Sequence, residues 1–282
     1  MSSTFKKLLS ATAIAGALVS GVAQAGVTWF PGGTIFEDDD VEQHIDTNGN
    51  KLLDVGDRLR GVFEIGRTAG IYGGTPADFG SDELTGIFDT TVVAMVSKGN
   101  GRYDYVFGPT AADGTIVTMY LGSATPLNLL GATNCATVAA CEAMASDAPI
   151  WATFGFDANG DGDEFWVAEN ALAAVGTVAK LPATTKVGFA NFGLSILINN
   201  TGKQFAGQDC SFVAPFCNSG DGKVTLTGSG DVLGGQGLSN GYIAHSDFDY
   251  QLANIPEPAS LALLGLGLMG VGATLRARRP QR

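Results

Sequence analysis

The apolar residues between Gly26 and Ile255 come in short runs that are separated by Gly, Asn, Asp and Pro. Runs of this kind, bounded by turn residues, predict β-strands. The predicted strands are Leu59–Ile65, Thr90–Val96, Arg102–Phe107, Thr115–Leu121, Trp151–Phe156, Lys186–Ile198, Val224–Thr227 and Phe248–Leu252. Asn100-Gly101 lies between two of them and predicts a hairpin. Only Asn134–Ser146 and Ala168–Ala179 predict short helices.

This pattern predicts an all-β fold, specifically an antiparallel β-sandwich or jelly-roll-like single domain over residues 26–255. Roughly eight to ten strands in a unit of this length are typical of such folds. The chain has 45% hydrophobic and 16% charged residues, which favours a packed domain over a disordered one. Residues 26–255 show no fixed-period repeat, so a solenoid or propeller is disfavoured. No charge run or Pro-rich linker divides them, so we expect one domain.

Residues 1–25 have the three-part plan of a secretory signal peptide. Lys6 and Lys7 form its basic start, and an apolar stretch follows from Leu8 to Val22. Ala23-Gln24-Ala25 supplies the small residues that signal peptidase requires. We therefore expect cleavage between Ala25 and Gly26, with a retained membrane anchor as the alternative.

The C-terminal segment, residues 256–282, also has three parts. Pro256-Glu257-Pro258 comes first, an apolar stretch runs from Ala259 to Leu275, and Arg276-Ala277-Arg278-Arg279 follows. As a helix, the stretch 259–275 would be about 25 Å long, which is enough to span a thin membrane. The arginines would stay on the cytoplasmic side, so residues 26–255 would face outward.

This tail resembles the PEP-CTERM sorting signal of Gram-negative bacteria. The resemblance implies recognition by an exosortase, a membrane-embedded cysteine transpeptidase, with processing near Pro256, Glu257 and Pro258. It also implies a host that makes extracellular polysaccharide or a biofilm matrix. The expected location is the outer cell surface or the extracellular matrix, reached through an intermediate anchored in the inner membrane. An ordinary C-terminal anchor that is never cleaved is the alternative.

The two ends conceal much of the acidity of the chain. Without them, 10 basic and 27 acidic residues remain, so residues 26–255 carry a net charge of −17. Such a surface repels phosphate backbones, which argues against nucleic acid as a partner. It suits divalent cations or a protein that its charge keeps soluble. The acidic run Glu37–Asp40 is expected to be a solvated loop, with a supplementary cation patch as the alternative.

Residues 46–57, D-T-N-G-N-K-L-L-D-V-G-D, match the ligand spacing of a twelve-residue calcium loop. The candidate ligands are Asp46, Asn48, Asn50, the Leu52 carbonyl, Asp54 and Asp57. The segment resembles an EF-hand or dockerin-type loop, with departures. Lys51 stands at the sixth position, where Gly is expected, and Asp57 reaches less far than Glu. The alternative is a polar turn between strands.

Residues 157–163, D-A-N-G-D-G-D, form a second candidate calcium loop. Its possible ligands are Asp157, Asn159, Asp161 and Asp163, completed by Glu164 or Glu169. No ligand stands at the twelfth position, so the EF-hand form is incomplete. The alternative is an acidic hairpin turn before Phe165–Val167.

The four cysteines fall into two local pairs, Cys135 with Cys141 and Cys210 with Cys217. Export makes oxidation the expectation. Three pairings are possible and the local one is the simplest. Loops this short would each contribute about 2 kcal/mol to stability.

The sequence holds few catalytic signals. His245-Ser246-Asp247 places triad residue types side by side, but triads are assembled in space rather than by adjacency. We find no nucleophile elbow and no phosphate-binding loop, so we expect a protein that is not an enzyme. A glycoside hydrolase needs only two carboxylates and stays a second alternative.

Aromatic side chains provide the remaining alternative. Trp29, Trp151 and Trp166 could stack on sugar rings, as in a carbohydrate-binding module, or fill the core. The leading hypothesis is an exported structural or adhesive protein of the cell surface or biofilm matrix, with loops that calcium stabilises. A carbohydrate-binding module for extracellular polysaccharide is the first alternative.

Overall fold

The computed structural model describes residues 26–79, 83–122, 124–129, 135–159, 162–210 and 223–255. These residues are mostly in antiparallel strands, so the all-β prediction is confirmed. The strands are β1 (Thr34–Ile45), β2 (Arg58–Gly70), β3 (Ala77–Asp78), β4 (Leu84–Gly99), β5 (Arg102–Pro109), β6 (Thr115–Leu121), β7 (Ile150–Gly155), β8 (Phe165–Leu172), β9 (Lys186–Asn199), β10 (Gln208–Asp209), β11 (Lys223–Val224), β12 (Leu226–Gly234) and β13 (Ala244–Leu252). The helices are α2 (Val138–Ala145) and α3 (Val175–Val178).

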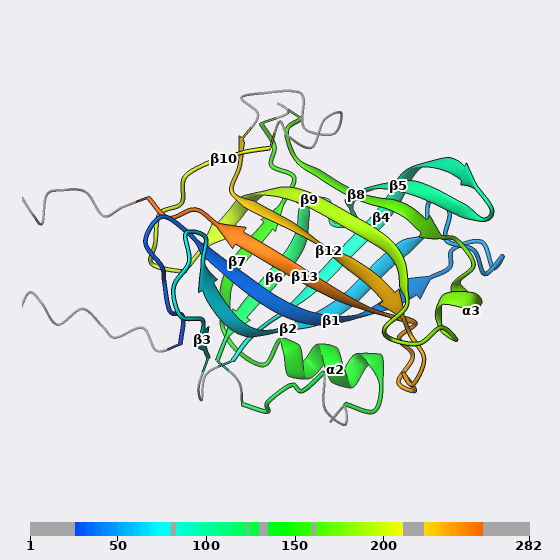
Figure 1. The fold of residues 1–282 in the computed structure, drawn as a ribbon, viewed down its shortest axis with the longest axis horizontal. Coiled ribbons are helices and arrows are strands. Elements are labelled where there is room, and N and C mark those ends of the chain that lie inside the picture. Colours follow the sequence, from blue (N-terminus) through cyan, green and yellow to red (C-terminus); the bar gives the residue numbers. More distant parts are fainter. Residues whose placement is uncertain are drawn as a thin grey trace, which may run out of the picture.

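Eleven strands form one sheet in the order β3-β2-β1-β13-β12-β9-β7-β6-β4-β5-β8. Additional pairings, β2 with β4 and β8 with β9, close this sheet on itself. The two opposing walls in Figure 1 therefore belong to one continuous sheet, not to the two separate sheets of the predicted sandwich. Closure leaves the two-residue β3, which pairs only with β2, as an edge of the described sheet. Long unpaired edges are the usual sites of aggregation in β proteins, and this edge is short.

Long strands make the closure possible because each pairs with different neighbours along its length. The 16-residue β4 pairs with β6 through Leu84–Phe88 and with β5 through Thr90–Gly99. The 14-residue β9 pairs with β8 through Phe189–Gly193 and with β7 through Ser195–Asn199. The wall between β4 and β9 is thus built by β6–β7 at one end and by β5–β8 at the other.

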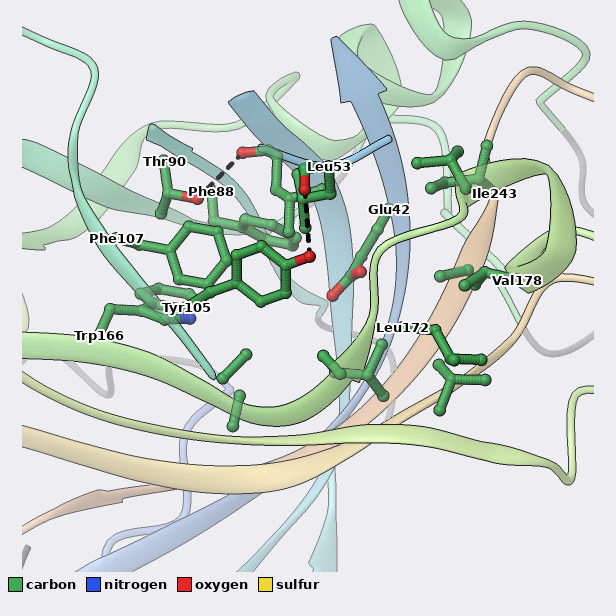
Figure 2. Close-up of a pocket in the computed structure, with 18 of the residues that line it drawn as sticks. Glu42, Leu53, Phe88, Thr90, Tyr105, Phe107, Trp166, Leu172, Val178 and Ile243 are labelled. Carbon is green, nitrogen blue, oxygen red and sulfur yellow. Dashed lines mark hydrogen bonds between the residues drawn. The ribbon is translucent and has the colours of Figure 1, made fainter. Parts of the chain in front are cut away.

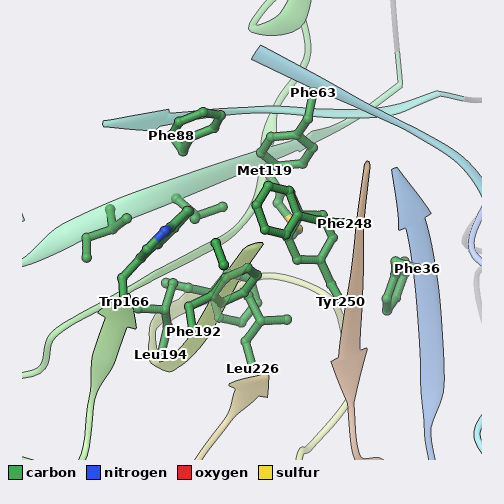
Figure 3. Packing of buried hydrophobic residues seen from close by; sticks show 14 of the residues in the cluster. Phe36, Phe63, Phe88, Met119, Trp166, Phe192, Leu194, Leu226, Phe248 and Tyr250 are labelled. Atoms are coloured by element: carbon green, nitrogen blue, oxygen red, sulfur yellow. The ribbon is translucent and has the colours of Figure 1, made fainter. Parts of the chain in front are cut away.

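Aromatic side chains fill the interior of the closed sheet (Figure 3). The rings of Trp166 and Phe192 stack with centroids 4.6 Å apart, and Phe192 lies 5.4 Å from the Tyr250 ring. Glycines facing inward make room for these rings. A Cβ at Gly228 would lie 2.1 Å from the Phe192 ring, and one at Gly86 would lie 2.1 Å from the Phe63 ring. The glycine content of the chain therefore serves packing as well as turns.

Helix α2 covers the outer face of the sheet and lies within the predicted segment Asn134–Ser146. It packs on a second apolar cluster that includes Val41 and Val62, which point outward from β1 and β2. The Thr137 hydroxyl accepts a hydrogen bond from the Ala140 amide at 3.2 Å and so caps the helix N-terminus.

Two sequence-based predictions of local structure are wrong. The sequence predicts a helix over Ala168–Ala179, but β8 continues to Leu172 and α3 is only four residues long. Residues of β8 pair with β5 on one side and with β9 on the other, and this ladder overrides the helical preference of the alanines. The acidic run Glu37–Asp40 is not the solvated loop that its charge predicts, because it lies in the middle of β1.

The described helices include none that is long and apolar enough to cross a membrane. The predicted signal peptide, with Ala25, and the predicted membrane helix at residues 259–275 lie outside the described residues.

Candidate functional site

The loop between β1 and β2 is organised around the Asp46 carboxylate. This carboxylate accepts hydrogen bonds from the backbone amides of Asn48 at 3.2 Å, Gly49 at 2.6 Å and Lys51 at 2.8 Å. These bonds, that of Lys51 foremost, lower the pKa of Asp46. Lys51 has a φ of 63°, the left-handed conformation for which calcium loops use glycine at their sixth position. Lys51 therefore differs from the expected glycine in residue type, but its backbone adopts the same left-handed conformation.

Three further candidate ligands are joined to one another. The Asn48 amide donates to both oxygens of Asp54, at 2.9 and 3.1 Å, and the Asn50 amide donates to Asp54 at 2.5 Å. The side chain of Leu52 is exposed, while its backbone forms an isolated bridge with Ala174. Asp46, Asn48, Asn50 and Asp54 thus share one hydrogen-bonded loop at the surface.

Asp57, the candidate for the twelfth position, turns away from this group. Its side chain is fully buried and accepts hydrogen bonds from the Thr47 amide and hydroxyl, both at 2.8 Å, and from the amide of Asp54 at 3.1 Å. His44 Nε2 lies 3.0 Å from Asp57 Oδ2. Burial alone would raise the pKa of Asp57, but the hydrogen bonds from Thr47 and His44 outweigh it and lower the pKa to about 2. Asp57 holds the base of the loop.

The second loop is less complete. Asp157 accepts hydrogen bonds from the amide and side chain of Asn159 at 2.8 and 2.7 Å, and Glu164 accepts one from the Asp157 amide at 3.0 Å. Asp163 is buried and accepts a bond from the Lys223 amide at 3.2 Å. Glu169 lies exposed in β8, five residues beyond Glu164 and so roughly 16 Å along the strand. Asp161 lies outside the described residues.

A third acidic group, which the sequence reasoning missed, is a row of carboxyls inside the closed sheet. Alternate residues of β1 point inward, and Asp38, Asp40 and Glu42 are 3%, 2% and 6% exposed. Asp38 accepts hydrogen bonds from the Phe248 amide at 2.7 Å and the Tyr250 hydroxyl at 2.5 Å. Strand alternation predicts such a row only where the segment is recognised as a strand, and the acidity of this segment conceals that.

The other two carboxyls of this row are less well satisfied. Glu42 accepts one hydrogen bond, from the Ser246 hydroxyl at 2.7 Å. Ser246 also lies near Asp40, but neither carboxyl oxygen of Asp40 has a partner in hydrogen-bonding geometry. Burial raises the pKa of Asp40 well above its ordinary value, and the neighbouring Asp38 and Glu42 raise it further. Burial also raises the pKa of Glu42, to about 7.

A cavity of about 60 Å³ begins at Glu42 and extends toward α3. In Figure 2, the Glu42 carboxyl points into the space between an aromatic group and an aliphatic group of side chains. Phe88, Tyr105, Phe107 and Trp166 belong to the first group, and Leu172, Val178 and Ile243 to the second. Leu53 of the Asp46–Asp57 loop also lines the cavity, and its carbonyl accepts a hydrogen bond from the Tyr105 hydroxyl at 3.1 Å.

The tryptophans do not form an exposed platform. Trp151 and Trp166 are 3% and 7% exposed, and both belong to the interior cluster. Trp29 is half-buried and stacks on Trp151 with ring centroids 5.8 Å apart. These contacts are those of core residues rather than of sugar-binding side chains.

Among the described residues, no group of three or more His, Cys, Asp or Glu side chains is arranged to hold a metal ion. The Asp46 loop is not such a group because two of its candidate ligands are asparagines. The inner carboxyls do not form one because they are spread along β1, at roughly 7 Å intervals.

The described part of the chain ends at Ile255, next to the tail that follows β13. The PEP-CTERM protein-sorting motif matches residues 254–279. The chain carries a PEP-CTERM sorting motif. This motif implies an exported protein that is processed by an exosortase. Its sorting residues Pro256, Glu257 and Pro258 lie outside the described residues. No curated protein and no solved structure shows a significant match to the chain.

The cysteines agree with the export that the PEP-CTERM motif implies. Cys135 and Cys141 form a disulfide, as predicted, and it fastens the segment before α2 to the helix itself. Cys210 is also disulfide-bonded, while Cys217 lies outside the described residues. Disulfides are typical of proteins that function outside the reducing cytoplasm.

Proposed function

We propose that this chain is a structural or adhesive protein of the cell surface or extracellular matrix of a Gram-negative bacterium, stabilised by calcium and without enzymatic activity. The observation that carries the proposal is the PEP-CTERM motif at residues 254–279, which follows directly on the closed β domain. The net charge of −17 and the disulfide support a role outside the cell.

Delivery is tested by following the full-length chain in a host with an exosortase. Replacement of Pro256, Glu257 and Pro258 by alanine should leave an unprocessed species in the membrane fraction, while the unaltered chain reaches the cell surface or medium. The control for general effects on export is Asp113→Ala, which removes an acidic side chain from an exposed turn outside the tail. Equal processing of the tail variant and the unaltered chain would contradict the proposal.

Calcium binding is proposed for the Asp46 loop. Asp46 and Asp54 would supply carboxylate oxygens to the ion. The side-chain amides of Asn48 and Asn50 would rotate to present their oxygens in place of their nitrogens. Because Asp57 is held by Thr47 and His44, the loop lacks the usual carboxylate at position twelve. Few charged ligands give weak sites, so we expect a dissociation constant of about 0.1–1 mM, as in extracellular modules.

Calorimetric titration and thermal unfolding with calcium or a chelator test this site. With a dissociation constant near 1 mM, calcium at 10 mM should stabilise the protein by about 1.4 kcal/mol. Asp46→Asn combined with Asp54→Asn should remove this effect. Asp113→Asn, in an exposed turn between β5 and β6, is the matched control. A stabilisation unchanged in the double variant would assign calcium to another site, such as that of Asp157.

A carbohydrate-binding role is the second candidate. A groove of about 190 Å³ lies along β9, β12 and β13, and its polar residues are typical of sites for sugar hydroxyls. Asn191, Ser229 and Asp249 lie in one row across these three strands. Binding on a glycan array that is lost in Asn191→Ala and Asp249→Ala, but kept in Asp113→Ala, would support this role. A blank array would count against it.

A further inference from the structure

The interior cavity differs from an ordinary packing defect because one end of it is acidic. Glu42 is the one charged side chain among the described residues that line it, and the other lining residues are apolar apart from Thr90 and Tyr105. One Glu42 oxygen accepts the hydrogen bond from Ser246. The cavity therefore offers a carboxyl group at the edge of an apolar space.

The arginines of the neighbouring strand β2 do not compensate the charge of Glu42. Arg58 and Arg60 form ion pairs with Asp89, and Arg67 pairs with Glu37. Asp40, the next inward residue of β1, is 2% exposed, and neither of its carboxyl oxygens has a hydrogen-bond partner. Buried carboxylates with few donors are costly, and no described cation pairs with Glu42, so an added cation would stabilise its ionised form.

Aromatic rings line one side of the same space (Figure 2). Phe88, Phe107, Trp166 and Phe248 line the cavity together with Tyr105. The faces of aromatic rings attract cations, and the attraction is stronger where water is excluded. A carboxylate beside several aromatic rings is an arrangement suited to organic ammonium groups.

A metal ion fits this site poorly. Calcium and magnesium require about six or more oxygen ligands, and the cavity presents one carboxyl group and two hydroxyl groups. The described residues contain no group of His, Cys, Asp and Glu arranged for a metal. An organic cation needs one carboxylate and an apolar surface for its carbon atoms, and the cavity provides both.

We propose that the cavity at Glu42 binds a small primary amine in its ammonium form, with the Glu42 carboxylate opposite the nitrogen and the aromatic and aliphatic walls around the carbon chain. The volume of about 60 Å³ is room for roughly four to six water-sized groups, so the ligand has few non-hydrogen atoms. The net charge of −17 raises the concentration of cations around the domain and assists their entry.

The test compares n-butylamine with butan-1-ol, which have the same carbon chain and differ in charge. Each is titrated into the purified protein at pH 8, and the signal followed is the NMR resonance of the Trp166 indole N–H, because Trp166 lines the cavity. Butylamine should shift this resonance saturably and bind at least about tenfold more tightly than butanol, since a hydrogen bond to a charged group favours the amine.

Glu42→Gln should lower the affinity for butylamine about tenfold and leave the affinity for butanol unchanged. The matched control is Glu37→Gln, on the same strand but on its outer face, where Glu37 pairs with Arg67. Equal affinities for amine and alcohol in the unaltered protein would overturn the proposal, as would equal losses in the two variants. The amine–alcohol comparison decides the matter even if Glu42→Gln does not fold.

Discussion

The Tyr250 hydroxyl donates a hydrogen bond of 2.5 Å to Asp38 Oδ2 inside the closed sheet. Asp38 belongs to β1 and Tyr250 to β13, and both side chains are almost completely buried. Burial raises the pKa of Asp38 well above its ordinary value, although the bonds from Tyr250 and Phe248 oppose this rise. The two strands at this seam of the sheet are thus joined by a polar contact in apolar surroundings.

Removal of the Tyr250 hydroxyl should destabilise the protein. In Tyr250→Phe, Asp38 keeps only the Phe248 amide as a donor, so we expect a loss of about 1–3 kcal/mol in the free energy of unfolding. Urea titration followed by fluorescence measures this. Tyr72→Phe is the control. Tyr72 is 85% exposed, so removal of its hydroxyl should change the free energy of unfolding by less than about 0.5 kcal/mol. Equal stability of the two variants would contradict the buried contact.

The protein should lose stability as the pH rises from about 4.5 to 7. The pKa of Glu42 is raised from 4.5 to about 7, mainly by burial, so the folded state keeps a proton that the unfolded chain releases in this interval. Below pH 4.5 both states are protonated, and above pH 7 the full cost of a few kcal/mol applies. Among the described residues, the titratable groups that share the interior with Glu42 include Asp38, Asp40, Tyr250 and Tyr105.

Chemical denaturation at pH 5 and pH 8 measures this dependence. Glu42→Gln, which cannot ionise, should show a smaller difference between the two pH values than the unaltered protein. Asp57 acts in the opposite direction, because its pKa is lowered to about 2, but its contribution is lost only as the pH falls below about 4. A stability that increases from pH 5 to pH 8 would contradict the role of the inner carboxyls.

An added methyl group at Gly228 should be poorly tolerated. Its Cβ would lie 2.1 Å from the Phe192 ring, which cannot move without disturbing its stack on Trp166. We expect Gly228→Ala to cost about 1–3 kcal/mol, seen as a lower melting temperature. Gly66→Ala is the control, because nothing lies within 4 Å of a Cβ there. Recovery of stability in a Gly228→Ala, Phe192→Leu double variant would confirm that the ring is the obstacle.

Loss of the disulfide should weaken the attachment of α2. Cys135→Ser combined with Cys141→Ser removes a loop closure that is worth about 2 kcal/mol. Hydrogen exchange should accelerate in α2 and in the apolar cluster below it more than in β9 and β12. Uniform acceleration across the whole domain would indicate that the helix is instead an integral part of the cooperative unit.

The sequence predicts a strand of this fold where the side chains that face the interior are apolar, and fails where they are acidic. In β13 the inward positions are Ala244, Ser246, Phe248, Tyr250 and Leu252, and their alternation with polar residues identifies the C-terminal half of the strand. In β1 the inward positions include Asp38, Asp40 and Glu42, so the same alternation exists but lacks apolar contrast. Closure was also beyond prediction, because strand patterns do not specify that β2 pairs with β4 or β8 with β9.

The candidate sites could be predicted from the sequence only where their contacts join neighbouring residues. Local spacing predicted that Asp46, Asn48, Asn50 and Asp54 would form one loop, since their contacts depend on a few neighbouring residues. The role of Asp57 depends on His44, which lies in β1, and the chain alone did not reveal that contact. The cavity at Glu42 is assembled from many strands and could be recognised only once they were in place.

The Asn254 side chain donates a hydrogen bond to the Phe30 carbonyl at 2.9 Å, which ties the two ends of the domain together. From there β1, 12 residues long, runs about 40 Å to the Asp46 loop at the far pole. The sorting motif at residues 254–279 therefore begins at one pole of the domain, and the Asp46 loop and α3 lie at the opposite pole. Any attachment made through that motif leaves the Asp46 loop on the side of the domain that faces away from it.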